Sequence, residues 1–282
     1  MRISEINIYP VKSLGGISVE KSIVEKRGFQ NDRRFMIVDK NGKFLSQREI
    51  SKMATIHTDI LDDKIKLSSV EPFDSLSIDL ANKFEKEINV QVWQSVCKGL
   101  LADEYTNNWF SDVLETECFL VQMPDSTERQ INKKFNKGRE IVSFADGYPY
   151  LLIGENSLHD LNKKLDKQIS MNRFRPNIVV EGFEAFAEDN WKKIRIGETI
   201  FRVTKPCARC VITTIDQETG IKEKSEPLKT LASYRKASEI YPENYQDLDI
   251  DENAVLFGQN LVAENFGEEL KIGDEIEILE EF

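Results

Sequence analysis

The chain of 282 residues is poor in the side chains that usually build protein metal centres, with only two histidines and four cysteines. A structural zinc site needs about four cysteine or histidine ligands. The sequence has a single Cys-x-x-Cys pair, Cys207 and Cys210, and the two histidines, His57 and His159, stand far from it. We therefore expect no zinc site and interpret both histidines as ordinary structural or surface residues.

Positive charge, long apolar runs and glycine-rich phosphate loops are also lacking. The formal net charge is -11, whereas sequence-independent binding of nucleic acid requires a basic surface. No segment approaches the ~20 apolar residues that span a bilayer, and residues 1–6 alternate like a strand, unlike a signal peptide. Neither a G-x-G-x-x-G nor a P-loop motif occurs. We predict a cytoplasmic protein that binds neither nucleic acid nor a membrane and whose cysteines are thiols.

Short strand-like segments separated by turns make up most of the chain. Many short strands with a few short helices are typical of an α+β protein centred on a β-barrel. Two similar segments, 194–200 and 270–276, each place a Gly-acid turn between apolar residues and predict two barrel hairpins. A polar stretch, 124–142, suggests a boundary between a β-rich N-terminal lobe, residues 1–125, and a second domain, residues 126–282. The first strands are free to join the second domain.

The clearest helical pattern covers residues 103–115. Tyr105, Trp109 and Val113 recur at every fourth position, and Phe110 lies beside them. This spacing places the side chains on one face of a helix, which we expect to pack under the strands of the N-terminal lobe.

The stretch from Lys205 to Asp216 contains the two cysteines of the Cys-x-x-Cys pair with Arg209 between them. Pro206 fixes the backbone before the first thiol, and the β-branched residues after Cys210 predict a strand. A thiolate beside a fixed cation can act as a nucleophile, a redox group or a soft-metal ligand. From the pattern alone, a functional site and a pair of packed structural cysteines are equally good interpretations.

Several cations lie at turns beside predicted strands in this otherwise acidic chain. They are Lys12, Arg33, Arg34, Arg175 and Arg209. A fixed cation in such a place can bind an anionic ligand. Each one alone is better explained as a solvated charge or a structural ion pair. Together with a thiolate, however, they would form a site for a phosphate-bearing cofactor with a soft-metal ligand.

Five segments, taken in order, resemble one protein family: the MOSC domain proteins with an N-terminal MOSC β-barrel lobe, and in particular its mitochondrial amidoxime-reducing components and bacterial YcbX. Each segment alone is a weak signal, whereas five in order over nearly the whole chain are a strong one. The segments are Tyr9-Pro10-Val11-Lys12-Ser13, Asp32-Arg33-Arg34-Phe35, Phe174-Arg175-Pro176-Asn177-Ile178, Cys207-Ala208-Arg209-Cys210 with Thr213, Thr214 and Asp216, and Leu256-Phe257-Gly258-Gln259.

The resemblance implies a molybdenum cofactor, whose metal is bound by the pterin dithiolene, by oxo groups and by one protein cysteine. By motif position this catalytic metal ligand is Cys210, and a soft thiolate suits molybdenum. No pyridoxal phosphate is required. At Gly147 and Tyr148 the chain departs from the small hydroxyl residues of the mitochondrial members, so we expect backbone contacts there. The residues expected to contact the cofactor are Lys12, Ser13, Arg33, Tyr148, Arg175, Asn177, Arg209 and Cys210.

The activity implied by the resemblance is reduction of N-hydroxylated compounds (amidoximes, hydroxylamines and N-hydroxylated bases) by oxygen-atom transfer to the metal. No cysteine follows Cys210, so we expect no C-terminal iron–sulfur domain. A separate ferredoxin-, flavodoxin- or cytochrome-type protein would supply the electrons. We likewise expect no N-terminal membrane anchor of the mitochondrial kind. The alternative function is a non-enzymatic molybdenum cofactor carrier or sulfur-transfer protein, and a third is a cofactor-free thiol protein.

Overall fold

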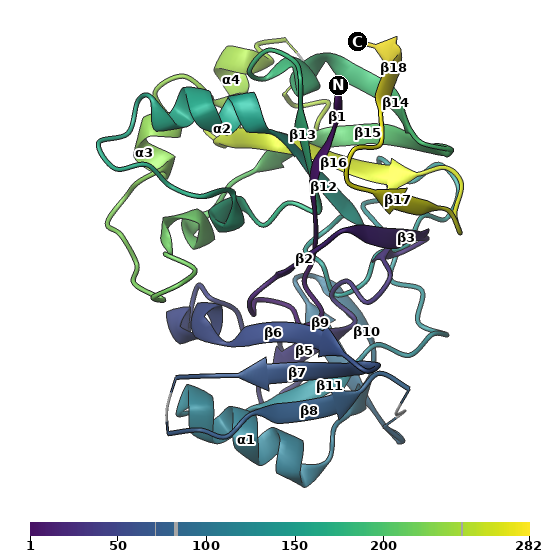
Figure 1. Ribbon diagram of the computed structural model, residues 1–282, viewed down its shortest axis with the longest axis vertical. Coiled ribbons are helices and arrows are strands. Elements are labelled where there is room, and N and C mark those ends of the chain that lie inside the picture. Colours follow the sequence, from purple (N-terminus) through teal and green to yellow (C-terminus); the bar gives the residue numbers. More distant parts are fainter. Residues whose placement is uncertain (71, 82–83, 244) are drawn as a thin grey trace.

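The computed structural model describes residues 1–70, 72–81, 84–243 and 245–282, and it shows an α+β protein with two lobes arranged along its longest axis (Figure 1). The upper lobe is built on one curled, mixed sheet of eight strands. In spatial order these are β18 (Ile276–Glu281), β14 (Trp191–Ile196), β15 (Thr199–Ala208), β16 (Leu256–Ala263), β12 (Tyr150–Gly154), β13 (Ile178–Glu181), β1 (Arg2–Ile8) and β2 (Ile17–Val19).

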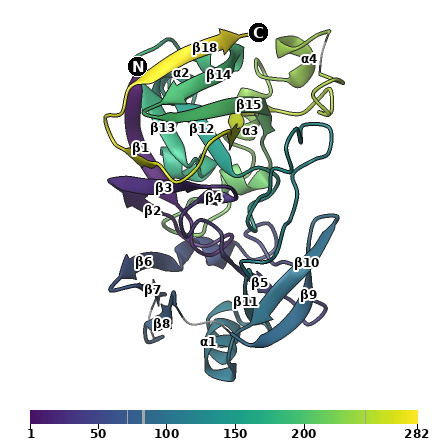
Figure 2. The same cartoon turned by 90° about the vertical axis from the view of Figure 1, so that its right-hand side faces the viewer.

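The upper lobe joins the two ends of the chain. β1 lies antiparallel to β13, so that Arg2 is opposite Glu181. A separate three-stranded sheet also joins early and late segments of the chain. In it, β3 (Lys21–Glu25) pairs with both β4 (Gly28–Phe29) and β17 (Glu269–Lys271). Both chain ends therefore lie in the upper lobe (Figure 2).

Aromatic packing fixes this union of early and late strands. The ring of Tyr150, on β12, meets the rings of Phe29 and Phe201 edge-on, with centroids 5.0 and 5.3 Å apart. All three residues are fully buried. Since each large aromatic side chain buries much apolar surface, these contacts stabilise the attachment of β4 to the upper sheet.

The lower lobe contains two antiparallel sheets and one long helix, α1 (Glu104–Leu114). In β7, Ile65 and Leu67 are buried while Lys64 and Lys66 are exposed, as expected for a strand with one face toward a core. The sheets are β5 (Phe35–Val38), β11 (Phe119–Gln122), β10 (Ser95–Leu101) and β9 (Lys86–Val92), and β6 (His57–Leu61), β7 (Lys64–Ser68) and β8 (Leu76–Asp79).

The helix predicted over 103–115 is confirmed, but one member of its buried face is wrong. The Asp103 side chain accepts a hydrogen bond from the Thr106 backbone N–H at 2.7 Å and so begins α1 as an N-cap. Trp109 and Val113 are buried, whereas Tyr105 is 69% exposed. Tyr105 lies in the first turn, at the edge of the apolar stripe, so the core-facing stripe is filled by residues further along the helix.

One of the two predicted barrel hairpins is confirmed and the other is wrong. β14 and β15 pair directly around Gly197, whose φ of 55° lies in the left-handed region that favours glycine. The second segment also turns, at Gly273, but β17 then pairs with β3 while β18 pairs with β14. A Gly-acid turn specifies that the chain reverses; it does not specify which sheet receives the next strand.

The strand predicted after Cys210 is also wrong, because β15 ends before it and residues Val211–Thr214 form a 3-10 turn, η4. The Cys210 carbonyl accepts hydrogen bonds from the backbone N–H of Thr213 at 3.1 Å and from its hydroxyl at 2.9 Å. Threonine side chains can satisfy the backbone locally in this way, and here that outweighs their preference for strands.

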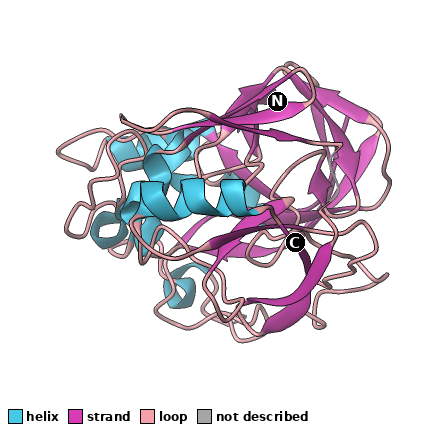
Figure 3. Cartoon of the chain, turned by 90° about the horizontal axis from the view of Figure 1, so that it is seen from below, coloured by secondary structure: helices cyan, strands magenta, loops and turns pink. Residues whose placement is uncertain are grey.

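The remaining helices are short, and seen from below the helices lie mainly on one side of the molecule (Figure 3). These short helices are α2 (Glu155–Asn162), α3 (Leu228–Leu231), α4 (Ala237–Ile240), η1 (Ser51–Thr55), η2 (Met171–Phe174) and η3 (Ala187–Asn190). No helix in the described part of the chain is both long and apolar enough to cross a membrane.

Candidate functional site

A cavity of about 330 Å³ lies where the two lobes meet. Its wall combines the loop after β1, the loop before β12, the turn η2 with its following residues, and the end of β15 with the start of η4. All eight residues expected from the sequence to contact a cofactor line this one cavity: Lys12, Ser13, Arg33, Tyr148, Arg175, Asn177, Arg209 and Cys210.

Two arginines of the inner wall pair with buried side chains in a cluster that we call the arginine layer. Arg33, Arg175 and Asn177 line the cavity, and Tyr9 and Asp32 contact them from behind. Arg33 Nη1 donates to both Asp32 carboxylate oxygens, at 2.7 and 3.0 Å, and to Asn177 Oδ1 at 2.9 Å. The guanidinium groups of Arg33 and Arg175 lie 4.2 and 4.3 Å from the centroid of the Tyr9 ring. Three sequence motifs therefore form one unit.

Four cavity residues adopt a left-handed backbone although none is glycine. They are Ser13, Arg33, Trp93 and Arg175, with φ angles of 68°, 48°, 55° and 56°. This region is sparsely populated by residues with a Cβ atom, so it persists only where surrounding contacts hold it. Here the Gln47 side chain donates to the Ser13 carbonyl at 2.9 Å, and Arg33 Nη2 donates to the Arg175 carbonyl at 3.3 Å.

Three of the arginines that line the cavity have a buried donor group for which the described residues supply no acceptor. Arg175 Nη1 donates to Gln217 Oε1 at 3.3 Å, but its buried Nη2 has no partner among the residues that the structure describes. Arg173 Nη1 and Arg209 Nε likewise have no partner within that part of the chain. Burial lowers the pKa of Arg175 to about 10, so the guanidinium is still charged at neutral pH. Buried, charged donors without acceptors suit an anionic ligand such as a phosphate.

Gln217 is held in place by an exchange of hydrogen bonds across the two lobes. Gln47 Nε2 donates to Gln217 Oε1 at 3.0 Å, and Gln217 Nε2 donates to Gln47 Oε1 at 3.0 Å. Both residues are buried. Neither glutamine could be predicted from the sequence, since a single amide in a turn carries no motif.

Each sulfur of the Cys-x-x-Cys pair accepts a contact from a different arginine. Arg209 Nη1 lies 2.8 Å from the Cys207 sulfur, and Arg48 Nη2, from the lower lobe, lies 3.2 Å from the Cys210 sulfur. In the described residues, no three His, Cys, Asp or Glu side chains come together to hold a metal. Cys210 fits the role of a single soft ligand to a metal whose other ligands come from an organic cofactor.

The outer edge of the cavity, which we call the rim, consists of Lys12, Arg48, Trp93 and Asp146. Asp146 forms an ion pair with Lys12, lies 3.7 Å from Arg48 Nη2 and accepts from Trp93 Nε1 at 3.2 Å. Burial lowers the pKa of Lys12 to about 8, against the opposing effect of Asp146. The charges of Lys12 and Arg48 hold the pKa of Asp146 well below its usual range.

Arg129 fixes the loop that carries Asp146 and Tyr148. Its guanidinium donates to the carbonyls of Ser143, Ala145 and Asp146, each at 2.7 Å. The residue is buried, so these charge-assisted bonds also satisfy backbone groups that water cannot reach.

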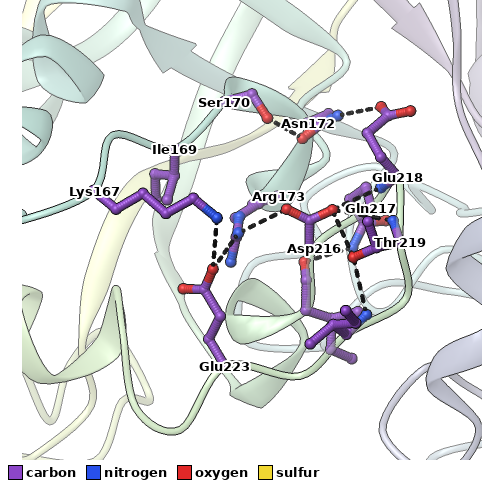
Figure 4. Close-up of polar contacts among 12 residues, drawn as sticks. Lys167, Ile169, Ser170, Asn172, Arg173, Asp216, Gln217, Glu218, Thr219 and Glu223 are labelled. Atoms are coloured by element: carbon purple, nitrogen blue, oxygen red, sulfur yellow. Dashed lines mark hydrogen bonds and ion pairs between the residues drawn. The ribbon is translucent and has the colours of Figure 1, made fainter.

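Asp216, part of the motif around the cysteines, lies in a neighbouring charged cluster (Figure 4). Arg173 Nη2 donates to Asp216 at 3.1 Å and to Glu223 at 2.9 Å, and Lys167 lies 3.5 Å from Glu223. Asp216 also accepts from the Thr219 hydroxyl at 3.0 Å. This cluster ties η2 to the segment after η4, and so it positions two walls of the cavity relative to each other.

One candidate cation lies elsewhere. Arg34 pairs with Asp125 at 2.7 Å and donates to the Met123 carbonyl at 3.1 Å, outside the residues that line the cavity in the described chain. Conversely, the structure adds Arg48, Trp93 and Asp146 to the site, none of which the sequence analysis identified.

A pocket between two β-rich lobes, with buried guanidinium donors at one wall and an accessible thiol at another, defines an anion-binding site with one soft-metal ligand. Residues 1–117 match the family model described as MOSC N-terminal beta barrel domain, and residues 139–277 match the MOSC domain. The chain belongs to the MOSC domain family.

Three curated relatives carry two kinds of name. The chain is 30% identical to mouse mitochondrial amidoxime-reducing component 1, over 98% of its own length and 82% of that protein. It is 32% identical to rat mitochondrial amidoxime reducing component 2, over 97% and 82%. It is 31% identical to the molybdenum cofactor sulfurase of Arabidopsis thaliana, over 83% of this chain and 31% of that protein. The first kind of name refers to amidoxime reduction, and the second refers to the molybdenum cofactor.

Proposed function

We propose that the protein is a molybdenum-cofactor-dependent oxidoreductase that reduces N-hydroxylated compounds such as amidoximes, hydroxylamines and N-hydroxylated bases. The observation that carries this proposal is one cavity that contains both an accessible sulfur, Cys210, and a buried guanidinium donor, Arg175 Nη2, that has no partner among the described residues. The names of the amidoxime-reducing relatives supply the class of reaction.

In this proposal Cys210 binds the metal, and the arginine layer binds the phosphate end of the cofactor. Lys12, Ser13 and Arg209 complete the contacts to the cofactor. Tyr148, which also lines the cavity, contributes through its backbone. The set agrees with the chemistry of the group, since a soft sulfur suits molybdenum and guanidinium groups suit phosphate.

The overall reaction adds two electrons and two protons to R–N–OH and gives R–N–H and water. The bound cofactor supplies the two-electron chemistry at the N–O bond. The protein orients it through Cys210, and Arg48 holds that sulfur from the opposite lobe. With a pKa of about 8, Lys12 Nζ carries an exchangeable proton near neutral pH at the cavity wall.

A separate electron-transfer protein of the ferredoxin, flavodoxin or cytochrome type supplies the electrons in this scheme. The scheme also places the protein in a reducing compartment, the cytoplasm, and the four free thiols support that placement. We further propose two functional units that divide near residue 125, with β1 to β4 built into the second unit although they precede the division.

The first test is the molybdenum-to-protein ratio of wild type and Cys210→Ala, both expressed in a host that makes the cofactor. We expect nearly one metal per wild-type chain, loss of metal and of benzamidoxime reduction in Cys210→Ala, and a smaller loss in the control Cys207→Ala. Equal metal content in wild type and Cys210→Ala would contradict the ligand assignment. Absence of molybdenum from both proteins would contradict the cofactor proposal itself.

A second candidate function, a non-enzymatic carrier of the cofactor, is favoured by the similarity to the plant cofactor sulfurase. It uses the same cavity, so binding alone does not separate the two. Turnover does: a carrier would retain molybdenum but would not reduce benzamidoxime when given a chemical reductant.

A further inference from the structure

A second cavity, of about 990 Å³, adjoins the first, and we call it the vestibule. Arg48, Trp93, Asp146 and Gly147 border both cavities. The rest of its wall comes from the β9–β10 hairpin, from residues 128–133, and from Lys43, Phe44 and Glu49. Because the two spaces share three residues of the rim, a molecule in the vestibule lies beside the cavity that contains Cys210.

Trp93 has an unusual backbone for its residue type. Val92 pairs with Ser95, so Trp93 and Gln94 form the two-residue loop of the hairpin. Trp93 has a φ of 55°, in the left-handed region where such loops strongly favour glycine, asparagine or aspartate. A bulky residue in this region is a genuine outlier, and outliers of this kind cluster at functional sites.

The indole of Trp93 is held firmly and yet remains open to solvent. Its Nε1 donates to Asp146 at 3.2 Å, the Arg48 guanidinium lies 4.6 Å from the ring centroid, and the Phe44 ring meets it edge-on at 5.0 Å. Even so, Trp93 is 45% exposed, whereas Trp109 and Trp191 are 8% and 1% exposed. A fixed, exposed indole beside two cavities is a ready surface for stacking a planar ligand.

The charges around the vestibule nearly cancel. Four cations and three carboxylates line it, which suits a ligand without formal charge better than an ion. They are Lys43, Arg48, Arg129 and Lys133, and Glu49, Glu128 and Asp146.

We propose that Trp93 is the specificity-determining residue of the vestibule, where its indole packs against the ring of a neutral aromatic N-hydroxylated substrate such as an arylamidoxime. The inference rests on the proposed function, to which it adds a substrate class. Packing on the indole would direct the N-hydroxyl group across the rim toward the cavity of Cys210. Arg48 and Asp146 hold the indole in place and act as positioning residues.

A binding experiment tests this without any turnover. The purified protein, without reductant, is titrated with benzamidoxime and with acetamidoxime, which carries the same N-hydroxyl group but no ring. Since the other two tryptophans are buried, fluorescence quenching reports on Trp93. We expect saturable quenching by benzamidoxime at concentrations where acetamidoxime has no effect, and loss of that response in Trp93→Phe.

A kinetic experiment measures the specificity itself. Trp93→Asn removes the ring but places a residue that accepts a left-handed backbone, so the hairpin is expected to fold. We expect the ratio of kcat/KM for benzamidoxime over acetamidoxime to fall about tenfold, mainly through KM, and Trp93→Phe to restore most of it. Tyr105→Ala, which removes an exposed aromatic ring outside the vestibule, is the matched control.

A purely structural role would give the opposite pattern, with a lower melting temperature in Trp93→Asn and an unchanged ratio. An unchanged ratio, or equal quenching by both amidoximes, overturns the proposal. If wild type reduces neither amidoxime, the proposed reductase function fails instead, and the fluorescence titration alone then decides whether Trp93 binds aromatic N-hydroxyl compounds.

Discussion

The arginine layer and the rim border the same cavity but are stabilised in different ways. In the arginine layer, the Asp32 side chain is fully buried and pairs with Arg33 at 2.7 Å. In the rim, the side chain of Asp146 is 55% exposed although it faces two cations. A buried pair is expensive to break, whereas partly exposed charges are screened by water. The layer is therefore suited to retaining a ligand permanently, and the rim to contacts that form and break during turnover.

The largest effect is expected from Asp32→Asn, which leaves the Arg33 guanidinium without its carboxylate. Breaking one partner of a buried pair costs about 3–5 kcal/mol, so the free energy of unfolding should fall by that amount in urea denaturation. Glu269→Gln, which removes the exposed partner of Lys21, is the control and should cost less than about 1 kcal/mol. Equal losses of unfolding free energy in the two variants would mean that the buried pair in the arginine layer stabilises the protein no more than an exposed ion pair does.

A pH titration of stability tests the rim. Lys12 has a pKa of about 8 in the folded protein, against 10.5 as its ordinary value. Between these values the unfolded chain binds more protons than the folded one, so stability rises with pH. Relative to Lys12→Met, wild type should gain up to about 3 kcal/mol from pH 8 to pH 10.5. Asp146 is ionised throughout this range, so a flat difference would mean that burial does not disfavour the Lys12 charge.

The smallest effect on stability is expected from Arg48→Gln. The Arg48 side chain is partly exposed, and its ion pair with Asp146 is long, at 3.7 Å, so we expect a loss below about 1 kcal/mol. If Cys210 binds the metal as proposed, metal retention should nevertheless fall by about 10-fold or more, because groups that contact a metal ligand control its orientation. Metal analysis after dialysis measures this, with Arg48→Lys as the control that keeps the charge. A large loss of stability together with normal metal content would mean that Arg48 stabilises the fold and does not act on ligand retention.

Sequence reasoning was informative where short motifs carry both the turn and the functional side chain. Arg33 and Arg175 stand beside strands within such motifs, and the structure brings both onto the Tyr9 ring. It failed for Arg48 and Trp93, which reach the cavity only through the approach of the lower lobe. No local pattern encodes that approach, because it depends on packing between segments far apart in the chain.

The same limit explains the errors in secondary structure. The β-branched residues after Cys210 favour a strand by propensity, but the Thr213 hydroxyl bonds to the Cys210 carbonyl and a 3-10 turn results. At Gly273 the turn is present as expected, but the partners of β17 and β18 are set by the closure of the whole upper lobe. Propensity describes local choices, and these outcomes were decided by distant contacts.

The pairing of β1 with β13, and of β3 with β17, has a consequence for biosynthesis. Partners such as Arg2 and Glu181 are separated by 179 positions, and Lys21 and Glu269 by 248. At roughly 5–20 residues per second on the ribosome, the first strands wait many seconds for their partners to emerge. The loop bearing Lys12 follows β1, so the pocket is completed only after β17 has emerged and paired with β3. Any ligand of this pocket must therefore be loaded after that point in synthesis.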